Sequence, residues 1–182
     1  MIDDELVRKI YACSKQAFST LFEEKNDENF YYCVLVTTEE GHPPFLSAWS
    51  EQALAREKQK GQESEEYFEY VRWSYADSPY IDYAGDAFAG LQAVFGARPG
   101  IESLDSEGWL IELDSRIIAM ERAMSMLDSE GIFSKNQPRG SVLINVELIP
   151  PTYSNTERAL RLNGSANSAL IRWLEEAAEK PD

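Results

Sequence analysis

Histidine and cysteine are scarce in this chain, which has one histidine and two cysteines among 182 residues. A zinc site needs several closely spaced Cys or His ligands, so the sequence predicts no metal site of that kind and no cofactor. A serine or cysteine nucleophile would have only His42 as an imidazole base. His42 lies in the turn GHPP, where we expect an exposed histidine without a catalytic role. The sequence therefore predicts no catalytic residue.

Long apolar runs are also missing. No stretch approaches the roughly 20 apolar residues that span a bilayer, and the N-terminus MIDDELVRKIYA lacks the apolar core of a signal peptide. Cys13 and Cys33 fall in a predicted helix and a predicted strand, where free buried thiols in a reducing compartment are the simplest interpretation. We expect a cytoplasmic protein that does not bind a membrane.

Basic residues are few, with 17 Lys and Arg against 32 Asp and Glu and a net charge of −15 at pH 7. Such a surface repels a phosphate backbone, so nucleic acid is not an expected partner. Acidic charge also serves solubility alone. The charge is uneven, however, because residues 61–87 contain seven acidic residues and only Arg72 as a base. This distribution suits a protein that meets a basic protein partner through one face.

The length and a hydrophobic content of 43% predict a single globular domain over residues 1–182 with a sizeable core. Apolar residues at helical spacing predict helices at 3–24, 51–60, 86–96, 109–128, 154–163 and about 165–177. Apolar runs rich in β-branched and aromatic residues predict strands at 30–37, 45–50, about 67–74 and 141–150. This order lacks regular βα alternation, so we expect an α+β fold with a largely antiparallel sheet of about four or more strands.

The segment 109–128 has the most regular pattern, with apolar residues three and four positions apart. The predicted buried face consists of Leu110, Leu113, Ile117, Met120, Met124 and Leu127. Fewer than three heptads are present, so a helix that faces the core is expected rather than a coiled coil. A structural or regulatory module that forms a homo-oligomer through this helix is kept as an alternative.

The segment YFEYVRWSYADSPY, residues 67–80, combines aromatic rings with acidic groups. Alternation along the predicted strand places most of the rings in the core, whereas the acidic flanks are free to meet a partner. Base stacking on these rings is disfavoured because the surrounding charge is negative. The residues predicted to contact a partner are Glu63, Glu65, Glu66, Glu69, Trp73, Tyr75, Asp77, Tyr80 and Asp82.

Three carboxylates in the same region allow a second hypothesis. Asp77, Asp82 and Asp86 are close in sequence, and paired carboxylates can hold a hard cation or serve as acid and base. They lack the spaced ligand pattern of an EF-hand, so solvated surface acids are the default interpretation. An uncharacterised enzyme that uses this carboxylate cluster is kept as an alternative.

Four segments in a fixed order carry a family resemblance: FYYCVLVTTEEGHPPFLSAWSEQAL, VRWSYADSPY, AMSMLDSEGIF and ERALRLN. Together they resemble the bacterial DUF4303 family, in which Arg-Trp-Ser and Arg-Leu-Asn motifs recur. This chain has the first at residues 72–74 and the second at 161–163, but YADSPY replaces the family's commoner tryptophan-containing run. The resemblance implies no known activity or catalytic residues. It implies a cytoplasmic immunity partner in bacterial toxin systems, so the leading hypothesis is a non-catalytic protein that binds and neutralises a toxin, such as a basic nuclease.

Overall fold

The computed structural model describes residues 4–61 and 64–181. Within these ranges the chain forms seven α-helices, three strands and several 3₁₀ turns. The strands are β1 (Phe30–Thr38), β2 (Phe45–Ser50) and β3 (Leu143–Ile149). The helices are α1 (Asp4–Glu24), α2 (Glu51–Gln59), α3 (Glu65–Val71), α4 (Leu91–Gly96), α5 (Ser106–Ser129), α6 (Tyr153–Leu162) and α7 (Ser168–Glu176). The α+β class is confirmed.

The sheet of the described chain is mixed, with strand order β2-β1-β3. β1 pairs antiparallel with β2 and parallel with β3, so Cys33 lies between Ala48 and Ile144. The prediction of four or more largely antiparallel strands is wrong. β3 runs parallel to β1 and opposite to β2, because the long connection from β2 to β3, which includes α5, reverses the chain direction and brings it back on the far side of β1.

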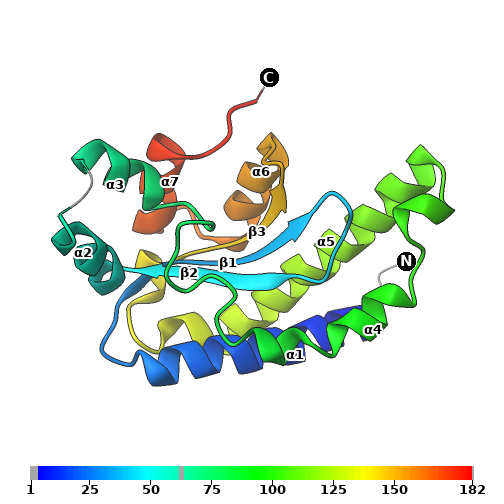
Figure 1. Cartoon of the computed structure of the whole chain (residues 1–182), viewed down its shortest axis with the longest axis horizontal. Helices are drawn as coiled ribbons and strands as arrows, with labels where there is room; N and C mark the ends of the chain where they lie inside the picture. Colours follow the sequence, from blue (N-terminus) through cyan, green and yellow to red (C-terminus); the bar gives the residue numbers. More distant parts are fainter. Residues whose placement is uncertain (1–3, 62–63, 182) are drawn as a thin grey trace.

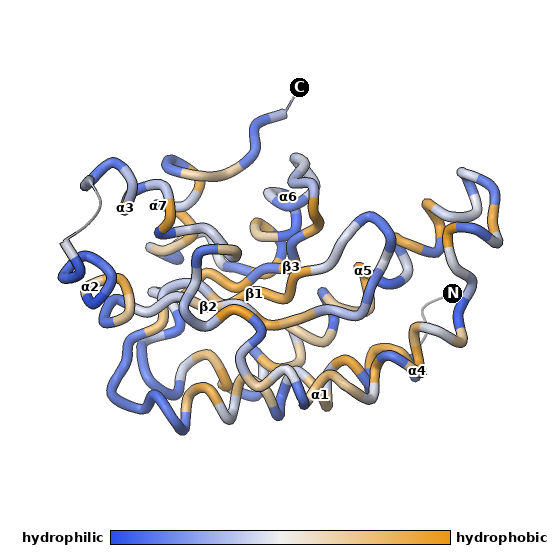
Figure 2. The backbone as a smooth tube through the Cα atoms, in the orientation of Figure 1, coloured by the Kyte–Doolittle hydropathy of each residue, from blue (hydrophilic) through white to orange (hydrophobic). Residues whose placement is uncertain are grey.

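Helices cover both faces of this sheet. Figure 1 shows α1 and α5 together on one side and α6 and α7 on the other. α1 and α5 run in the same direction, because Asp4 lies 3.8 Å from Arg122 while Lys15 lies 2.7 Å from Glu130. Figure 2 shows the hydrophobic colours concentrated along the strands between the two helical layers. β1 is buried on both faces, as its run of apolar residues predicted.

Residues 65–71 form helix α3, so the strand predicted at about 67–74 is wrong. Ser64 caps the helix by accepting a hydrogen bond from the backbone N–H of Tyr67, and two glutamates complement the dipole of the first turn. Phe68 and Val71, three positions apart, are buried, whereas Tyr70 is 74% exposed. The burial therefore follows a helical period, and the local cap outweighs the β-propensity of the rings.

The free edge of β3 is closed by side chains rather than by a fourth strand. Three polar residues on one side of α6 reach this edge: Asn155, Arg158 and Asn163. Asn163 bonds both the N–H and the carbonyl of Ile144. Asn155 does the same for Leu148, and the guanidinium of Arg158 donates to the carbonyl of Val146. These bonds satisfy the strand backbone, which explains how a sheet this small ends without an exposed edge here.

The opposite edge, along β2, is covered by the connection between α3 and α4. The backbone N–H of Asp82 donates to the Leu46 carbonyl at 2.8 Å, and the Ser78 hydroxyl donates to the Ala48 carbonyl. This connection therefore contributes single hydrogen bonds to β2 instead of the ladder that a further strand would make.

Two helix starts differ from those expected. α6 begins at Tyr153, one residue before the predicted start, and follows Thr152 as its N-cap residue. α7 begins at Ser168, later than the predicted start at about 165, and is capped by Asn167, which accepts a hydrogen bond from the Leu170 N–H. Both cysteines are free thiols; Cys33 is buried, as expected, whereas Cys13 is only partly buried. Among the described residues, no helix is long and apolar enough to cross a membrane.

Candidate functional site

The acidic residues of α3 are on the surface. Glu65, Glu66 and Glu69 are exposed, and Glu65 forms an ion pair of 2.7 Å with Lys58 of α2. Glu63 lies outside the described residues. The structure therefore leaves two of the predicted contact residues on this helix, Glu66 and Glu69, without an ion pair to the described part of the chain.

Two predicted contact residues, Trp73 and Tyr80, are buried at 7% and 4% exposure. The Trp73 indole N–H donates to Glu176 at 2.7 Å, and its ring meets the Tyr31 ring edge-on at 5.3 Å. The Tyr80 hydroxyl donates to the buried carboxylate of Glu28 at 2.7 Å. These rings hold the connecting segment on the sheet, so they are not surface contacts.

The remaining predicted residues, Tyr75, Asp77 and Asp82, lie along the outer side of the same connection. Tyr75 is half-buried, and its ring is 6.3 Å from that of Phe45. The carboxylate of Asp77 accepts a hydrogen bond of 2.6 Å from the Ser74 hydroxyl. Asp82 is exposed, and its carboxylate forms no hydrogen bond or ion pair with any residue that the structure describes. Asp82 is therefore free to bind, as Glu66 and Glu69 are, and it is the one of these three that lines a groove.

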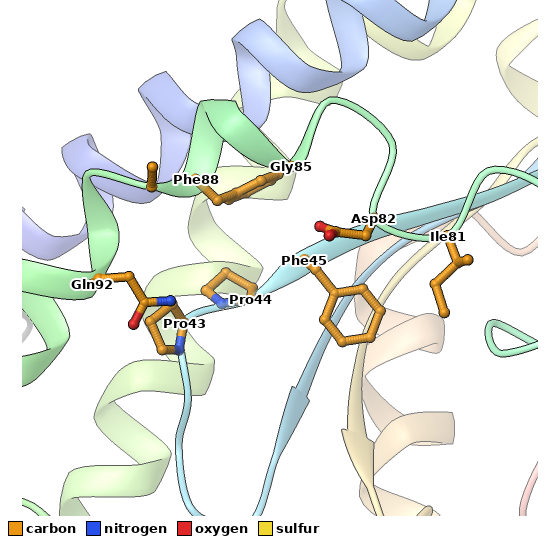
Figure 3. A pocket seen from close by; sticks show the side chains of 9 residues that line it. Pro43, Pro44, Phe45, Ile81, Asp82, Gly85, Phe88 and Gln92 are labelled. Carbon is orange, nitrogen blue, oxygen red and sulfur yellow. The ribbon is translucent and has the colours of Figure 1, made fainter.

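Asp82 opens into a groove of about 460 Å³ at the edge of the sheet. The groove is lined mainly by non-polar side chains and one amide: Pro43, Pro44, Phe45, Ile81, Phe88 and Gln92. Figure 3 shows the Asp82 carboxylate pointing toward the space between Phe45 and Phe88. A carboxylate without a partner, set among mainly non-polar side chains, can pair with one cationic side chain or ligand that enters the groove.

The backbone around Asp82 is held in an uncommon conformation. Asp82 and Ala84 have φ angles of 51° and 54°, in the left-handed region that residues other than glycine rarely adopt. A Cβ atom at Gly85 would lie 2.6 Å from Asp82 Oδ1, so glycine is needed for the carboxylate to lie where it does. The hydrogen bond from the Asp82 N–H to Leu46 anchors this turn on β2.

The other wall of the groove follows the β1–β2 turn, which α5 holds in place. The buried guanidinium of Arg116 donates to the Gly41 carbonyl at 2.6 Å and to Glu112 at 2.7 Å. The Trp109 indole donates to the Glu39 carbonyl at 3.1 Å. Because a buried cation and a buried ring fix this turn, the wall formed by the prolines after it is pre-organised before any partner binds.

The structure does not assemble a catalytic constellation from the residues that the sequence offered. The His42 ring pairs with the Thr38 hydroxyl at 2.8 Å, within its own turn. In the described ranges, no group of three or more His, Cys, Asp or Glu side chains is arranged to hold a metal ion. Asp77, Asp82 and Asp86 are all described, so the carboxylate cluster that the sequence suggested is not formed as a metal-binding group.

Sequence reasoning missed a buried polar group on the sheet. Glu147 of β3 is only 9% exposed, and burial raises the pKa of its carboxyl to about 7, while Tyr32 and Arg158 partly oppose that rise. The Tyr32 hydroxyl and the Asn145 side-chain oxygen are buried without a hydrogen bond of ordinary geometry in the described structure. The sequence contained a sign of this buried polar group: Asn145 and Glu147 lie on one face of a predicted strand whose other face is apolar.

A family model described as a domain of unknown function, DUF4303, matches residues 10–164. No curated protein matches the chain, and no solved structure does. The match spans most of the chain, from within α1 to the residue after the Arg-Leu-Asn motif, and includes β1, the Asp82 groove and β3. The chain therefore belongs to the DUF4303 family.

Proposed function

We propose that this protein is a non-catalytic, immunity-type protein that binds and neutralises a basic partner, such as a bacterial toxin, through the face that carries Asp82. The unpaired Asp82 carboxylate in its groove carries this proposal. An exposed carboxylate in a groove that also offers non-polar side chains suits recognition, because the groove supplies burial and the charge supplies selectivity.

The fit to a basic side chain follows from the chemistry of the groove. The aliphatic stem of an Arg or Lys would pack on Phe45 and Ile81, which is 42% exposed, and its cationic head would reach Asp82. The stem gains from leaving water, and the carboxylate gains a partner that the described chain does not provide. Such a residue would be the central anchor of the interface.

Surrounding charge favours the same kind of partner. Glu66, Glu69 and Asp77 are exposed on the connection that carries Asp82 or on the helix before it, and the whole chain has a net charge of −15. Acids around an interface raise the association rate with a cationic protein and make that rate sensitive to salt. Loss of charge at the rim should therefore slow binding, whereas loss of the anchor should speed dissociation.

The test begins with identification of the partner. A photo-cross-linking analogue, benzoylphenylalanine, is introduced at Ile81 and irradiated in cells of the source organism, and the adduct is identified by mass spectrometry. We expect a basic protein whose purified form binds the wild-type chain. The Asp82→Asn variant should bind it at least about tenfold more weakly, and Asp82→Lys more weakly still.

Two controls make the result decisive. The same cross-linker at Ile171, which is exposed on α7, should not capture the partner, and Glu102→Lys, outside the groove, should leave its affinity within about twofold. An acidic cross-linked protein, or equal affinity for wild type and both Asp82 variants, would refute binding through the groove.

Neutralisation is tested separately with the identified partner. Expressed alone, the partner should arrest bacterial growth, and co-expression of the wild-type chain, but not of Asp82→Lys, should restore it. A partner that binds through Asp82 without being toxic would remove the immunity part of the proposal and leave the binding part standing.

A further inference from the structure

Helix α5 has an apolar outer face that the described part of the chain does not cover. The exposed hydrophobic residues on it, with their exposed fractions, are Leu110 (61%), Ile111 (66%), Ile118 (43%) and Met126 (39%). Leu110 was expected on the buried face, but it points outward near the start of the helix. Ile118 lies near the middle of this face, because Ile111 and Ser125 are each seven positions away from it, two full turns of a helix.

The outer face forms a ridge between two grooves. One groove, of about 590 Å³, is lined by Leu104, Ile111 and Ile118. The other, of about 490 Å³, is lined by Ile118, Arg122 and Leu162. Ile118 belongs to both, so a ridge of side chains from another helix could lie in either groove while Ile118 packs against it.

We propose that a second copy of this chain docks here, with the two α5 helices antiparallel about a twofold axis at Ile118. In this arrangement, a residue a given number of positions before Ile118 in one copy lies at the same level as the residue that many positions after Ile118 in the other copy. Ile118 then meets Ile118 of the second copy, and Ile111, seven positions before it, faces Ser125, seven positions after it. The pair therefore covers Ile111 and Ile118, whereas Leu110 and Met126 lie on its two flanks.

The charges on the same face select this occupant and this orientation. Asp114 lies four positions before Ile118 and Arg122 four positions after it, so the antiparallel pair makes two Asp114–Arg122 contacts. Within its own chain, Arg122 has only a 3.8 Å contact with the exposed Asp4, and Asp114 has no ion pair to the described residues. A parallel pair would place like charges together. Self-complementarity of this kind is required of a second copy and of no other partner.

Charge reversal tests the pairing directly. Sedimentation equilibrium of the wild type over a range up to about 100 µM should show a monomer–dimer equilibrium. Asp114→Arg or Arg122→Asp alone creates two like-charge contacts and should raise the dissociation constant at least about tenfold. The double variant restores two opposite-charge contacts and should return the dissociation constant to within about threefold of the wild type. Glu175→Arg, on the exposed side of α7, should have no effect.

A cysteine at the axis provides an independent geometric readout. In a Cys13→Ser background, Ile118→Cys should form a disulfide-linked dimer under mild oxidation, whereas Ile171→Cys, with a similar exposed fraction of 46%, should not. Melting temperatures check that each variant is folded. A wild type that is monomeric at about 100 µM, a folded double variant that does not recover association, or equal cross-linking at both positions would each overturn the antiparallel dimer.

Discussion

Replacement of Glu147 by glutamine tests the electrostatics of the sheet. Glu147 lies in the middle of β3, and charged or ionisable groups approach it from several elements: Tyr32 from β1, Tyr75 from the connection after α3, Arg158 from α6 and Glu179 from the C-terminal segment. Burial is the largest influence and raises the pKa of the carboxyl to about 7. Glutamine keeps the shape and cannot ionise.

The sign of the effect follows from the direction of the pKa change. Below about pH 4.5 the carboxyl is protonated in both the folded and the unfolded chain, so burying it does not lower the free energy of unfolding through ionisation. As the pH rises toward 7 the unfolded chain releases the proton first, and the folded state loses stability relative to it. The loss is complete above about pH 7. With about 1.4 kcal/mol for each pH unit, the interval from 4.5 to about 7 corresponds to roughly 3 kcal/mol.

The assay is urea unfolding followed by tryptophan fluorescence, for which the chain has four tryptophans. The free energy of unfolding is measured for wild type and Glu147→Gln at pH 5, 6, 7 and 8. The free energy of unfolding of Glu147→Gln minus that of the wild type should increase by about 2.5 kcal/mol between pH 5 and pH 8. Only the wild type has a carboxyl at position 147 that ionises over this range. Taking the difference removes the other titrating groups.

An exposed glutamate on α7 provides the control for this prediction. Glu175→Gln changes an exposed glutamate of α7, and its difference from the wild type should stay flat with pH. If the curves of Glu147→Gln and wild type run parallel from pH 5 to pH 8, the carboxyl is not held in a buried environment and the reasoning is refuted.

Three further substitutions test how the fold is closed. Asn155→Ala leaves two buried backbone groups of β3 without partners and should lower the free energy of unfolding by about 2–4 kcal/mol in urea titrations; a loss under about 1 kcal/mol would contradict closure of the edge by α6. Gly41→Ala should cost at least about 1 kcal/mol more than Gly61→Ala, because both glycines have positive φ but only at Gly41 would the new Cβ lie 2.9 Å from a side chain; equal costs would show that the turn gives way. Tyr80→Phe should cost about 1.5–3 kcal/mol at pH 7 because it removes a hydrogen bond to the buried Glu28 carboxylate, and an unchanged melting temperature would argue against that bond.

Local patterns in the sequence predicted most of the elements. The apolar run at 30–37 became β1, and the helix predicted at 51–60 became α2, which Ser50 caps by accepting from the Ala53 N–H. The spacing of apolar residues in α5 correctly gave Leu113 and Met120 as buried. These features depend on neighbours a few positions away, so a single sequence contains what is needed to predict them.

The error at 67–74 has a specific cause. Aromatic alternation favoured a strand, whereas the Ser64 cap and two acids favoured a helix, and the sequence gives no measure of which preference wins. The helix wins because β2 is already closed by Asp82 and Ser78, which leaves no backbone edge for a further strand. The number of strands is thus decided by what covers each edge.

The candidate site, like the fold, could be predicted from the sequence only in part. Composition predicted an acidic surface and no catalytic histidine, because net charge and residue counts need no coordinates. The sequence could not separate Asp82 from the other acids, nor Trp73 and Tyr80 from exposed rings. That separation depends on residues distant in the chain: Phe45 and Phe88 form the groove around Asp82, and Glu176 and Glu28 bind the buried rings.

The sequence by itself determined the class of the fold, the positions of most helices and strands and the sign of the surface charge, since each follows from local periodicity or from counting. Only the tertiary structure decided that three strands suffice, that Glu147 is buried and that Asp82 is unpaired beside a groove. Burial and pairing are properties of groups brought together from distant parts of the chain, and their energies arise when water is removed from between them.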